Sequence, residues 1–398
     1  MKSLRGFSRP TNMRKICVLM MALVAVAAST EMIGPNRLPA DRVLKNLKAR
    51  LAKNPKDAEV EYMLGRTYYA LFCAEDPRTI QLYGTAESAR FPSMHTNVWE
   101  FKDLKPRGDK ESVAKIRASI SHLQNAIALG GGEPGLYQLT LACAFEASAP
   151  IATKVDPKAS ESRFKDKALF YYEQSYLASR RSDEKRPFPQ MAGTYEKWIS
   201  MEASDSILRL DPKNALKSDI EAHVKVMQSL PPGPITPIVF SLNASRGLED
   251  LLDHGRIVPF DLDGTGARQR YSWVKADTAI LVWQPNPRVP IRNGRQLFGS
   301  ASWWIMPKDG YAAMALLDDN ADGWLTGREL NGLAIWRDQN QNGVAEPSEV
   351  VPIARTAIAG LRTRATGRIG PSLVSTGGLR LVNGTVLPTY DWVTRAVQ

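Results

Sequence analysis

A proline-rich break at residues 231–234 divides the chain into two parts that must fold by different rules. The segment reads Pro-Pro-Gly-Pro, and Pro237 follows it. Proline lacks a backbone N–H, so a regular helix cannot continue through such a segment. Apolar residues recur at helical spacing before the break, whereas short β-type runs follow it, with seven of the nine tryptophans beyond residue 250. We therefore expect a multidomain protein, with an all-α domain over 38–230, a linker over 231–237 and an α+β domain over 238–398.

The N-terminal part is predicted to be an array of paired helices. In one predicted helix, Val60, Leu64 and Tyr68 share a face at four-residue spacing. The other predicted helices cover residues 113–129, 136–147, 164–178, 195–210 and 215–230. An Asn/Asp-Pro-Lys sequence recurs at 54–56, 156–158 and 211–213, and proline at these points would end one helix and begin the next.

These paired helices resemble tetratricopeptide repeats. Leu64-Gly65 followed by Tyr68 is similar to the packing signature of the first repeat helix, and residues 168–172 with Ala178 are similar to the second. The spacing is irregular, and residues 74–110 form a long insertion. The resemblance implies a solenoid with a concave surface for an unidentified protein or peptide partner. A plain helical bundle is the alternative.

Two twelve-residue segments, 318–329 and 338–349, carry the strongest functional signal. Each has side-chain oxygens at positions 1, 3 and 5, glycine at position 6 and glutamate at position 12. Ca²⁺ takes six to eight oxygen ligands, which such a loop can supply. The expected ligands of the first loop are Asp318, Asn320, Asp322, Glu329 and the Trp324 carbonyl; those of the second are Asp338, Asn340, Asn342, Glu349 and the Val344 carbonyl. Weaker candidates stand at position 9 of each loop: Thr326, through a bridging water, and Glu346.

The short distance between the loops indicates structural calcium. Residues 330–337 alone separate them, so we expect one short helix there, with Leu333 and Trp336 buried. Pro352 follows the second loop almost at once, which leaves room for only a short exiting helix. Calcium sensors open by moving longer helices apart. We therefore expect two calcium ions that stabilise the fold with moderate affinity.

Residues 234–361 resemble the EF-hand-type calcium-binding modules of large secreted bacterial proteins, including those of the repeats-in-toxin class. Apart from the tandem loops, the similar segments are 260–266, 272–274, 296–299, 310–311 and 336–338. The resemblance implies a weak third site at Asp261, Asp263 and Thr265, which lacks a closing glutamate. It also implies a loop over 284–296. There the family expects acidic residues at several positions that carry Gln284, Arg288 and Gln296 in this chain, so we expect that loop to be metal-free.

No motif for catalysis is recognised in the sequence. It contains no Gly-x-Ser-x-Gly, no His-Glu-x-x-His and no phosphate-binding loop. Some relatives of the calcium module cut themselves at Asp-Pro bonds, which this chain has at 76–77, 156–157 and 211–212. Helix punctuation explains the last two better. We expect a non-enzymatic protein, and the alternative is a calcium-dependent self-processing or hydrolytic enzyme.

The N-terminus has the form of a secretory signal peptide over residues 1–29. Five basic residues and no acid precede an apolar run at 16–28, which ends in small residues. Thirteen apolar residues are too few to cross a bilayer, which needs about twenty. Removal of this segment lowers the net charge by five, from +11 to +6, spread over a long chain. We expect an exported protein, located in the periplasm, at the cell surface or outside the cell, without a membrane span or a nucleic-acid partner.

Two cysteines, Cys73 and Cys143, would remain in the exported chain. Both lie in apolar helical patterns. An oxidising compartment permits a disulfide between them, and two buried free thiols are equally consistent with the pattern.

Overall fold

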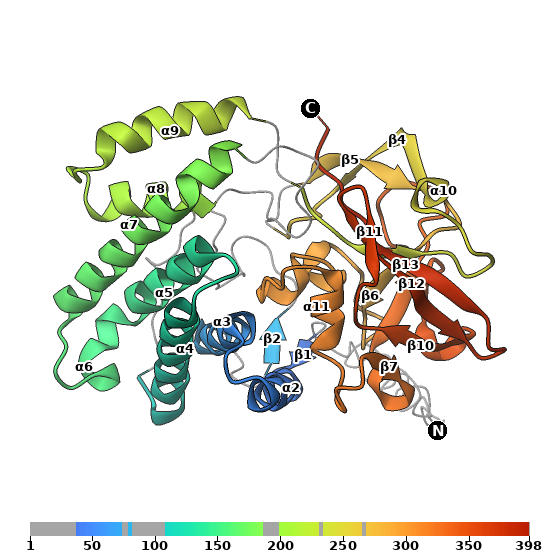
Figure 1. Cartoon of the computed structure of the whole chain (residues 1–398), viewed down its shortest axis with the longest axis horizontal. Coiled ribbons are helices and arrows are strands. Elements are labelled where there is room, and N and C mark those ends of the chain that lie inside the picture. Colours follow the sequence, from blue (N-terminus) through green and yellow to red (C-terminus); the bar gives the residue numbers. More distant parts are fainter. Residues whose placement is uncertain are drawn as a thin grey trace, which may run out of the picture. The chain divides into compact units, whose positions relative to one another are not determined.

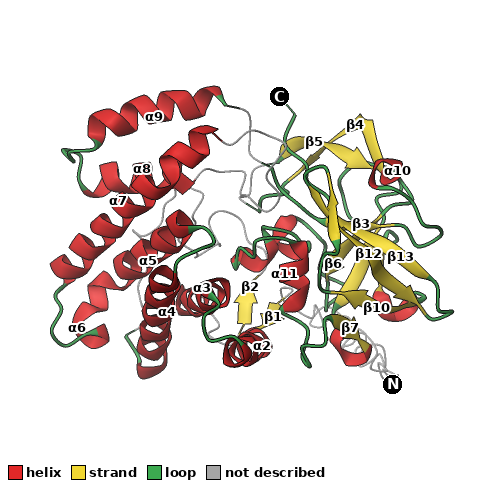
Figure 2. Ribbon diagram, viewed as in Figure 1, coloured by secondary structure: helices red, strands yellow, loops and turns green. Residues whose placement is uncertain are grey.

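The computed structural model describes residues 37–73, 79–81, 108–185, 199–230, 234–264 and 268–397. It contains an N-terminal helical region and a C-terminal curled antiparallel sheet, which confirms the multidomain α-plus-β layout (Figures 1 and 2). The predicted signal peptide, the Asp76–Pro77 bond, Thr265 and most of the insertion at 74–110 lie outside the described residues.

The helical region consists of helices that pack on their neighbours in chain order. They are α2 (Ala40–Lys53), α3 (Ala58–Cys73), α4 (Lys110–Leu129), α5 (Pro134–Ser148), α6 (Ala152–Val155), α7 (Glu161–Lys185), α8 (Ile199–Leu210) and α9 (Lys217–Ser229). Gly65 explains the close packing of α3 on α4, because a Cβ atom there would lie 2.6 Å from Cγ of Leu123. Among the described residues, no helix combines the length and apolarity needed to cross a bilayer.

The three Asn/Asp-Pro-Lys sequences form the same kind of turn between helices. The carbonyls of Asn54, Asp156 and Asp211 each accept a hydrogen bond from the backbone N–H three residues later, at 3.2, 2.9 and 3.0 Å. These turns join α2 to α3, α6 to α7 and α8 to α9. The Asp-Pro bonds at 156–157 and 211–212 therefore lie in interhelical turns. The resemblance to tetratricopeptide repeats stays a prediction.

The C-terminal region is built on a nine-stranded antiparallel sheet. Eight strands follow the order β7-β10-β12-β13-β3-β6-β8-β9, and β11 pairs with β12. The bounds are β3 (Ile238–Phe240), β6 (Ala279–Trp283), β7 (Trp324–Thr326), β8 (Leu333–Trp336), β9 (Val350–Pro352), β10 (Ile358–Arg362), β11 (Gly367–Ile369), β12 (Ser372–Leu381) and β13 (Val386–Asp391). Two-stranded sheets are formed by β4 (Leu252–Phe260) with β5 (Gln269–Val274), and by β1 (Arg37–Pro39) with β2 (Thr79–Gln81). Strands β12 and β13 are consecutive in the chain and pair as an antiparallel hairpin around residues 383–384.

Both faces of the central strands are buried, and alternate residues enter different cores. In β6, Leu281 belongs to a cluster that includes α11 (Gly310–Ala315) and extends into the helical region, whereas Ile280 and Val282 face a second cluster with β4 and β5. The two-residue period of a strand produces this division. The first cluster joins the helical region and the sheet in one continuous hydrophobic core.

The prediction of a short helix between the two loops is wrong. Residues 333–336 form strand β8, which pairs with β6 on one side and β9 on the other. Leu333 and Trp336 are both buried, as expected, but on opposite faces of the sheet. After the second loop the chain forms strand β9 and then a 3₁₀ helix of only three residues, Ile353–Arg355, in line with the expected lack of room for a longer exiting helix. Pairing with distant strands therefore overrides the local helical preference.

Cys73 and Cys143 are both free thiols and both buried. Of the two alternatives left open by the sequence, the structure has the unbridged one. Burial raises the pKa of each thiol to about 12, so neither is a reactive thiolate near neutral pH.

The end of β13 generates a testable pH dependence. Asp391 is fully buried, and its Oδ2 accepts a hydrogen bond from the N–H of Gly310 at 2.9 Å. Burial, reinforced by the nearby Asp309 carboxylate, raises the pKa of Asp391 from 3.8 to about 8. The folded chain therefore keeps a proton that the unfolded chain releases above about pH 4. The contribution of the protonated Asp391 carboxyl to the free energy of unfolding is therefore fully present below about pH 4. It is lost as the pH rises through 8.

We expect Asp391→Asn to remove this part of the pH dependence, because an amide does not ionise. The measurement is the free energy of unfolding in urea between pH 5 and 9, with the exposed Asp166→Asn as the control. If the free energy of unfolding of Asp391→Asn falls with pH as steeply as that of the parent, the raised pKa of Asp391 is contradicted.

Candidate metal centre

The two twelve-residue loops adopt the same backbone conformation. Position 4 has a positive φ in both, 58° at Ala321 and 54° at Gln341. Position 6 is also left-handed, with φ of 90° at Gly323 and 69° at Gly343. Left-handed conformations are costly for residues other than glycine, so their repetition at position 4 indicates a specific loop geometry in both segments.

The aspartate at position 1 organises each loop by accepting hydrogen bonds from its backbone. Asp318 accepts from the N–H groups of Asp322 at 3.2 Å and Gly323 at 2.9 Å. The same two contacts recur in the second loop, where Asp338 accepts from Asn342 at 3.0 Å and from Gly343 at 2.8 Å. Both aspartates are buried.

The side chain of the glutamate at position 12 accepts a hydrogen bond from the start of its loop. Glu329 Oε1 accepts from the N–H of Asp319 at 2.8 Å, and Glu349 Oε1 accepts from the N–H of Gln339 at 2.8 Å. Both glutamates are buried. The first and last predicted ligands of each loop are therefore both bonded to its backbone.

The side chains at positions 3 and 5 complete the repeated pattern. Asn320 and Asn340 accept from the N–H of position 5 at 2.9 and 3.1 Å. Asp322 and Asn342 accept from the N–H of position 7 at 2.8 and 2.6 Å. Both loops thus direct the same set of side-chain oxygens toward their own backbone.

The donor set of each loop is suited to a hard cation. Its predicted ligands are oxygens of carboxylates, amides and backbone carbonyls, which Ca²⁺ prefers. Within the described residues, no group of three or more His, Cys, Asp or Glu side chains is arranged as a metal cluster. The carboxylates instead accept the backbone N–H groups given above.

The first loop is held from outside by helix α2, and its segment β7 pairs with strand β10. Arg42 donates from Nε to Asp319 Oδ1 at 2.8 Å and from Nη2 to the Leu317 carbonyl at 2.7 Å. Asn46 donates to Asp319 Oδ1 at 2.9 Å. Burial alone would raise the pKa of Asp319, but these two donors hold it below its usual range. Asp319 is at position 2, outside the predicted ligand set.

The second loop is held by the β4–β5 hairpin. Trp273 donates from its indole Nε1 to Asp338 Oδ2 at 2.7 Å. Arg256 donates to the Gln341 carbonyl at 2.9 Å, and the Gln341 side chain donates to the Val274 carbonyl at 2.8 Å. Sequence reasoning gave no role to these contacts, because they join residues far apart in the chain.

Glu346, the weaker candidate of the second loop, lies close to Glu349, the glutamate at position 12 of that loop. It accepts from the side-chain amides of Asn342 at 2.9 Å and Asn340 at 3.4 Å. Hydrogen bonding with Glu349 and then with these amides lowers the pKa of Glu346 to about 2, whereas burial and the adjacent Glu346 raise the pKa of Glu349. Thr326, the weaker candidate of the first loop, donates its backbone N–H to Glu329 at 3.0 Å.

Buried Arg295 lies near Asp261 and Asp263, two of the ligands of the predicted weak third metal site. The Arg295 guanidinium lies 3.4 Å from the centre of the Trp304 ring. Burial lowers the pKa of Arg295 to about 9, opposed by the charges of Asp261 and Asp263. A guanidinium thus supplies positive charge beside these aspartates. The sequence separation of more than thirty residues hid this pairing.

The loop expected to be metal-free is organised by its amide side chains. Gln284 donates to the Val289 carbonyl at 2.8 Å, and Gln296 Oε1 accepts from the N–H of Arg292 at 2.9 Å. Gln296 therefore bonds to its own loop backbone, as the closing glutamates of the other loops do.

A serine, a histidine and a glutamate in the helical region make triad-like contacts. His223 Nε2 lies 2.8 Å from Ser200 Oγ, and its Nδ1 lies 2.7 Å from Glu184. A nucleophilic serine must give its proton to the histidine, but Ser200 Oγ donates to Asp183 at 2.6 Å and is fully buried. The group is therefore best explained as a structural network between α7, α8 and α9.

Comparison with known proteins finds a family model that matches the sheet region of the chain. Residues 238–391 match the family model described as the SPM domain, a range that begins with β3, ends with β13 and contains both loops. The chain is also similar to the iron-regulated protein FrpA of Neisseria meningitidis serogroup C, with 28% identity over 199 residues. That match covers 48% of this chain but 16% of FrpA, so the chain corresponds to a small part of that relative.

The glycine at position 6 of the second loop provides a test of this geometry. A Cβ atom on Gly343 would lie 2.4 Å from Cγ1 of Val258 and 2.9 Å from the Pro259 carbonyl oxygen. Gly327 also has a positive φ, 50°, but a Cβ there meets nothing within 4 Å. We expect Gly327→Ala to cost about 1 kcal/mol of unfolding free energy through backbone strain alone, and Gly343→Ala to cost roughly 1–3 kcal/mol more.

Urea unfolding of the two variants in metal-free buffer measures this difference. Equal losses in both would show that loop 338–349 does not pack against β4 as described.

Proposed function

We propose that this chain is an exported, non-enzymatic calcium-binding protein with one Ca²⁺ in each loop. The observation that carries the proposal is the repeated geometry of 318–329 and 338–349. The two loops share left-handed positions 4 and 6 and the same contacts of the residues at positions 1, 3, 5 and 12. Two ordinary polar turns would have no reason to agree at so many positions.

The charge of the loops supports a divalent cation. The predicted ligands of the first loop include three carboxylates, those of Asp318, Asp322 and Glu329, and those of the second include two, Asp338 and Glu349. A bound divalent cation would offset this negative charge. Arg42 does not serve this purpose, because its ion pair is with Asp319, outside the predicted ligand set.

The position of the loops supports a structural role for the metal. The first loop contains β7, at one edge of the sheet path, and the second connects β8 to β9, at the other edge. Ligands from both ends of each loop would be fixed together in the bound state. We therefore propose that calcium stabilises both edges, with the moderate affinity suited to a calcium-rich exterior.

We also propose that the helical region binds a protein or peptide partner. Its helices pack successively in chain order, as in solenoids that present extended binding surfaces. Helix α7 supports this role, because Phe170 and Leu177, seven residues apart on one side of the helix, are 51% and 48% exposed.

Thermal unfolding in metal-free buffer and in millimolar Ca²⁺ tests the calcium proposal. The parent should melt at a higher temperature with Ca²⁺, because a ligand that binds only the folded state stabilises it by about 2.7 kcal/mol at a hundredfold excess over Kd. Asp318→Ala/Asp338→Ala should lose this rise. The matched control Asp41→Ala/Asp166→Ala, two exposed residues of α2 and α7, should keep it.

If Ca²⁺ does not raise the melting temperature of the parent, the loops are ordinary polar turns and the calcium proposal is wrong. The same samples, run on a denaturing gel, address the alternative of self-processing. A defined fragment that forms only with Ca²⁺ would replace the non-enzymatic assignment, whereas an intact chain supports it.

A further inference from the structure

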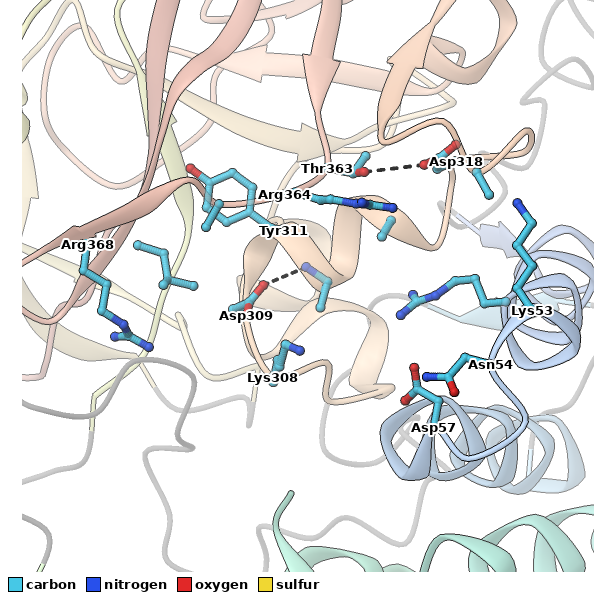
Figure 3. Close-up of a pocket in the computed structure, with 16 residues that line it drawn as sticks. Lys53, Asn54, Asp57, Lys308, Asp309, Tyr311, Asp318, Thr363, Arg364 and Arg368 are labelled. Carbon is cyan, nitrogen blue, oxygen red and sulfur yellow. Dashed lines mark hydrogen bonds between the residues drawn. The ribbon is translucent and has the colours of Figure 1, made fainter. Parts of the chain in front are cut away.

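A cavity of about 670 Å³ lies beside the first loop (Figure 3). Its walls come from the end of α2 and the turn into α3, from α11 and the residues before it, from the first loop, and from the chain around β11. This volume is in the range of small-molecule sites. Apart from Asp318, the lining residues have no role in the predicted functions of the chain.

The polar lining of the cavity is rich in basic side chains. Five basic residues line it, against three acidic ones. The basic residues are Arg50, Lys53, Lys308, Arg364 and Arg368, and the acidic ones are Asp57, Asp309 and Asp318. In Figure 3, Lys53 at the end of α2 and Arg364 after β10 stand on opposite walls.

The three carboxylates are engaged by backbone N–H groups. Asp57 accepts from the N–H of Val60 at 3.0 Å at the start of α3, and Asp309 accepts from the N–H of Ala312 at 2.7 Å at the start of α11. Asp318 holds the first loop together. These acids are therefore explained by the local backbone.

The basic side chains of the cavity are only partly satisfied by the described residues. Lys308 pairs with Glu59 at 2.7 Å, and Arg368 donates to the Pro371 carbonyl at 3.2 Å. Nη1 of Arg50, in contrast, is buried without a hydrogen-bond partner in the described part of the chain. A buried guanidinium N–H left unpaired is unfavourable, so its retention in a cavity wall points to a ligand.

We propose that this cavity binds a small molecule that carries two or more oxyanion groups, phosphates or carboxylates. Guanidinium groups suit both, because their planar N–H pairs match two oxygens at once. Arg50, Lys53 and Arg364 would bind one oxyanion group, and Arg368, which lies apart from Arg364 in Figure 3, would bind another. Ala312, Ala365 and Leu373 offer an apolar surface for the body of the ligand. This site does not depend on the calcium proposal.

Isothermal titration calorimetry of the full chain tests the proposal with two probes, pyrophosphate and the tricarboxylate tricarballylate. Metal is removed beforehand with a chelating resin, because EGTA is itself a polycarboxylate and calcium precipitates pyrophosphate. We expect one site per chain for at least one probe, and the tighter probe identifies phosphate or carboxylate as the source of the oxyanion.

Lys53→Ala/Arg364→Ala should weaken that binding roughly tenfold or more, and both residues are exposed, so the fold should persist. Arg50→Gln should weaken it as well, with an unchanged circular dichroism spectrum as evidence of folding. The matched control Arg355→Ala, an exposed arginine outside the cavity, should bind like the parent. The proposal is overturned if the parent binds neither probe, or if Lys53→Ala/Arg364→Ala binds like Arg355→Ala.

Discussion

The connection between β7 and β8 is the constraint on which the C-terminal fold depends. These strands are six positions apart along the sheet path, which in a flat sheet would separate them by about 29 Å. The chain joins them through residues 327–332, which can reach at most about 25 Å when fully extended. The four residues Gly327–Leu330 form a tighter 3₁₀ turn and shorten this reach further. The sheet must therefore curl until its two ends approach each other.

This curl accounts for the placement of the two loops and for what holds them. The first loop contains one of the joined strands and the second follows the other, so both lie where the sheet closes. Each loop is supported by a different distant element, the first by Arg42 and Asn46 of α2 and the second by Trp273 of β5. In the proposed role, calcium in the two loops would stiffen the region where the two ends of the sheet approach each other. The contact with α2 also ties the helical region to the first loop.

The parts of the structure that the sequence predicted are those set by local chemistry. The turns at Asn54, Asp156 and Asp211 need only proline and a backbone hydrogen bond, and they form where the pattern placed them. The paired contacts of Asp318 and Asp338 also lie within twelve residues, but the sequence predicted these side chains only as calcium ligands. Prediction failed where partners come from afar. Residues 333–336 fit a helix or a strand until β6 and β9 pair with them, and no local pattern links Arg295 to Asp261 or brings Arg50 and Arg364 to one cavity.

The amount of calcium bound per chain, counted by equilibrium dialysis, tests the central claim most directly. The account predicts two ions on the parent chain, one on Asp318→Ala and one on Asp338→Ala, because each aspartate organises a separate loop. A parent chain that binds no calcium would contradict it, and so would single variants that retain both ions.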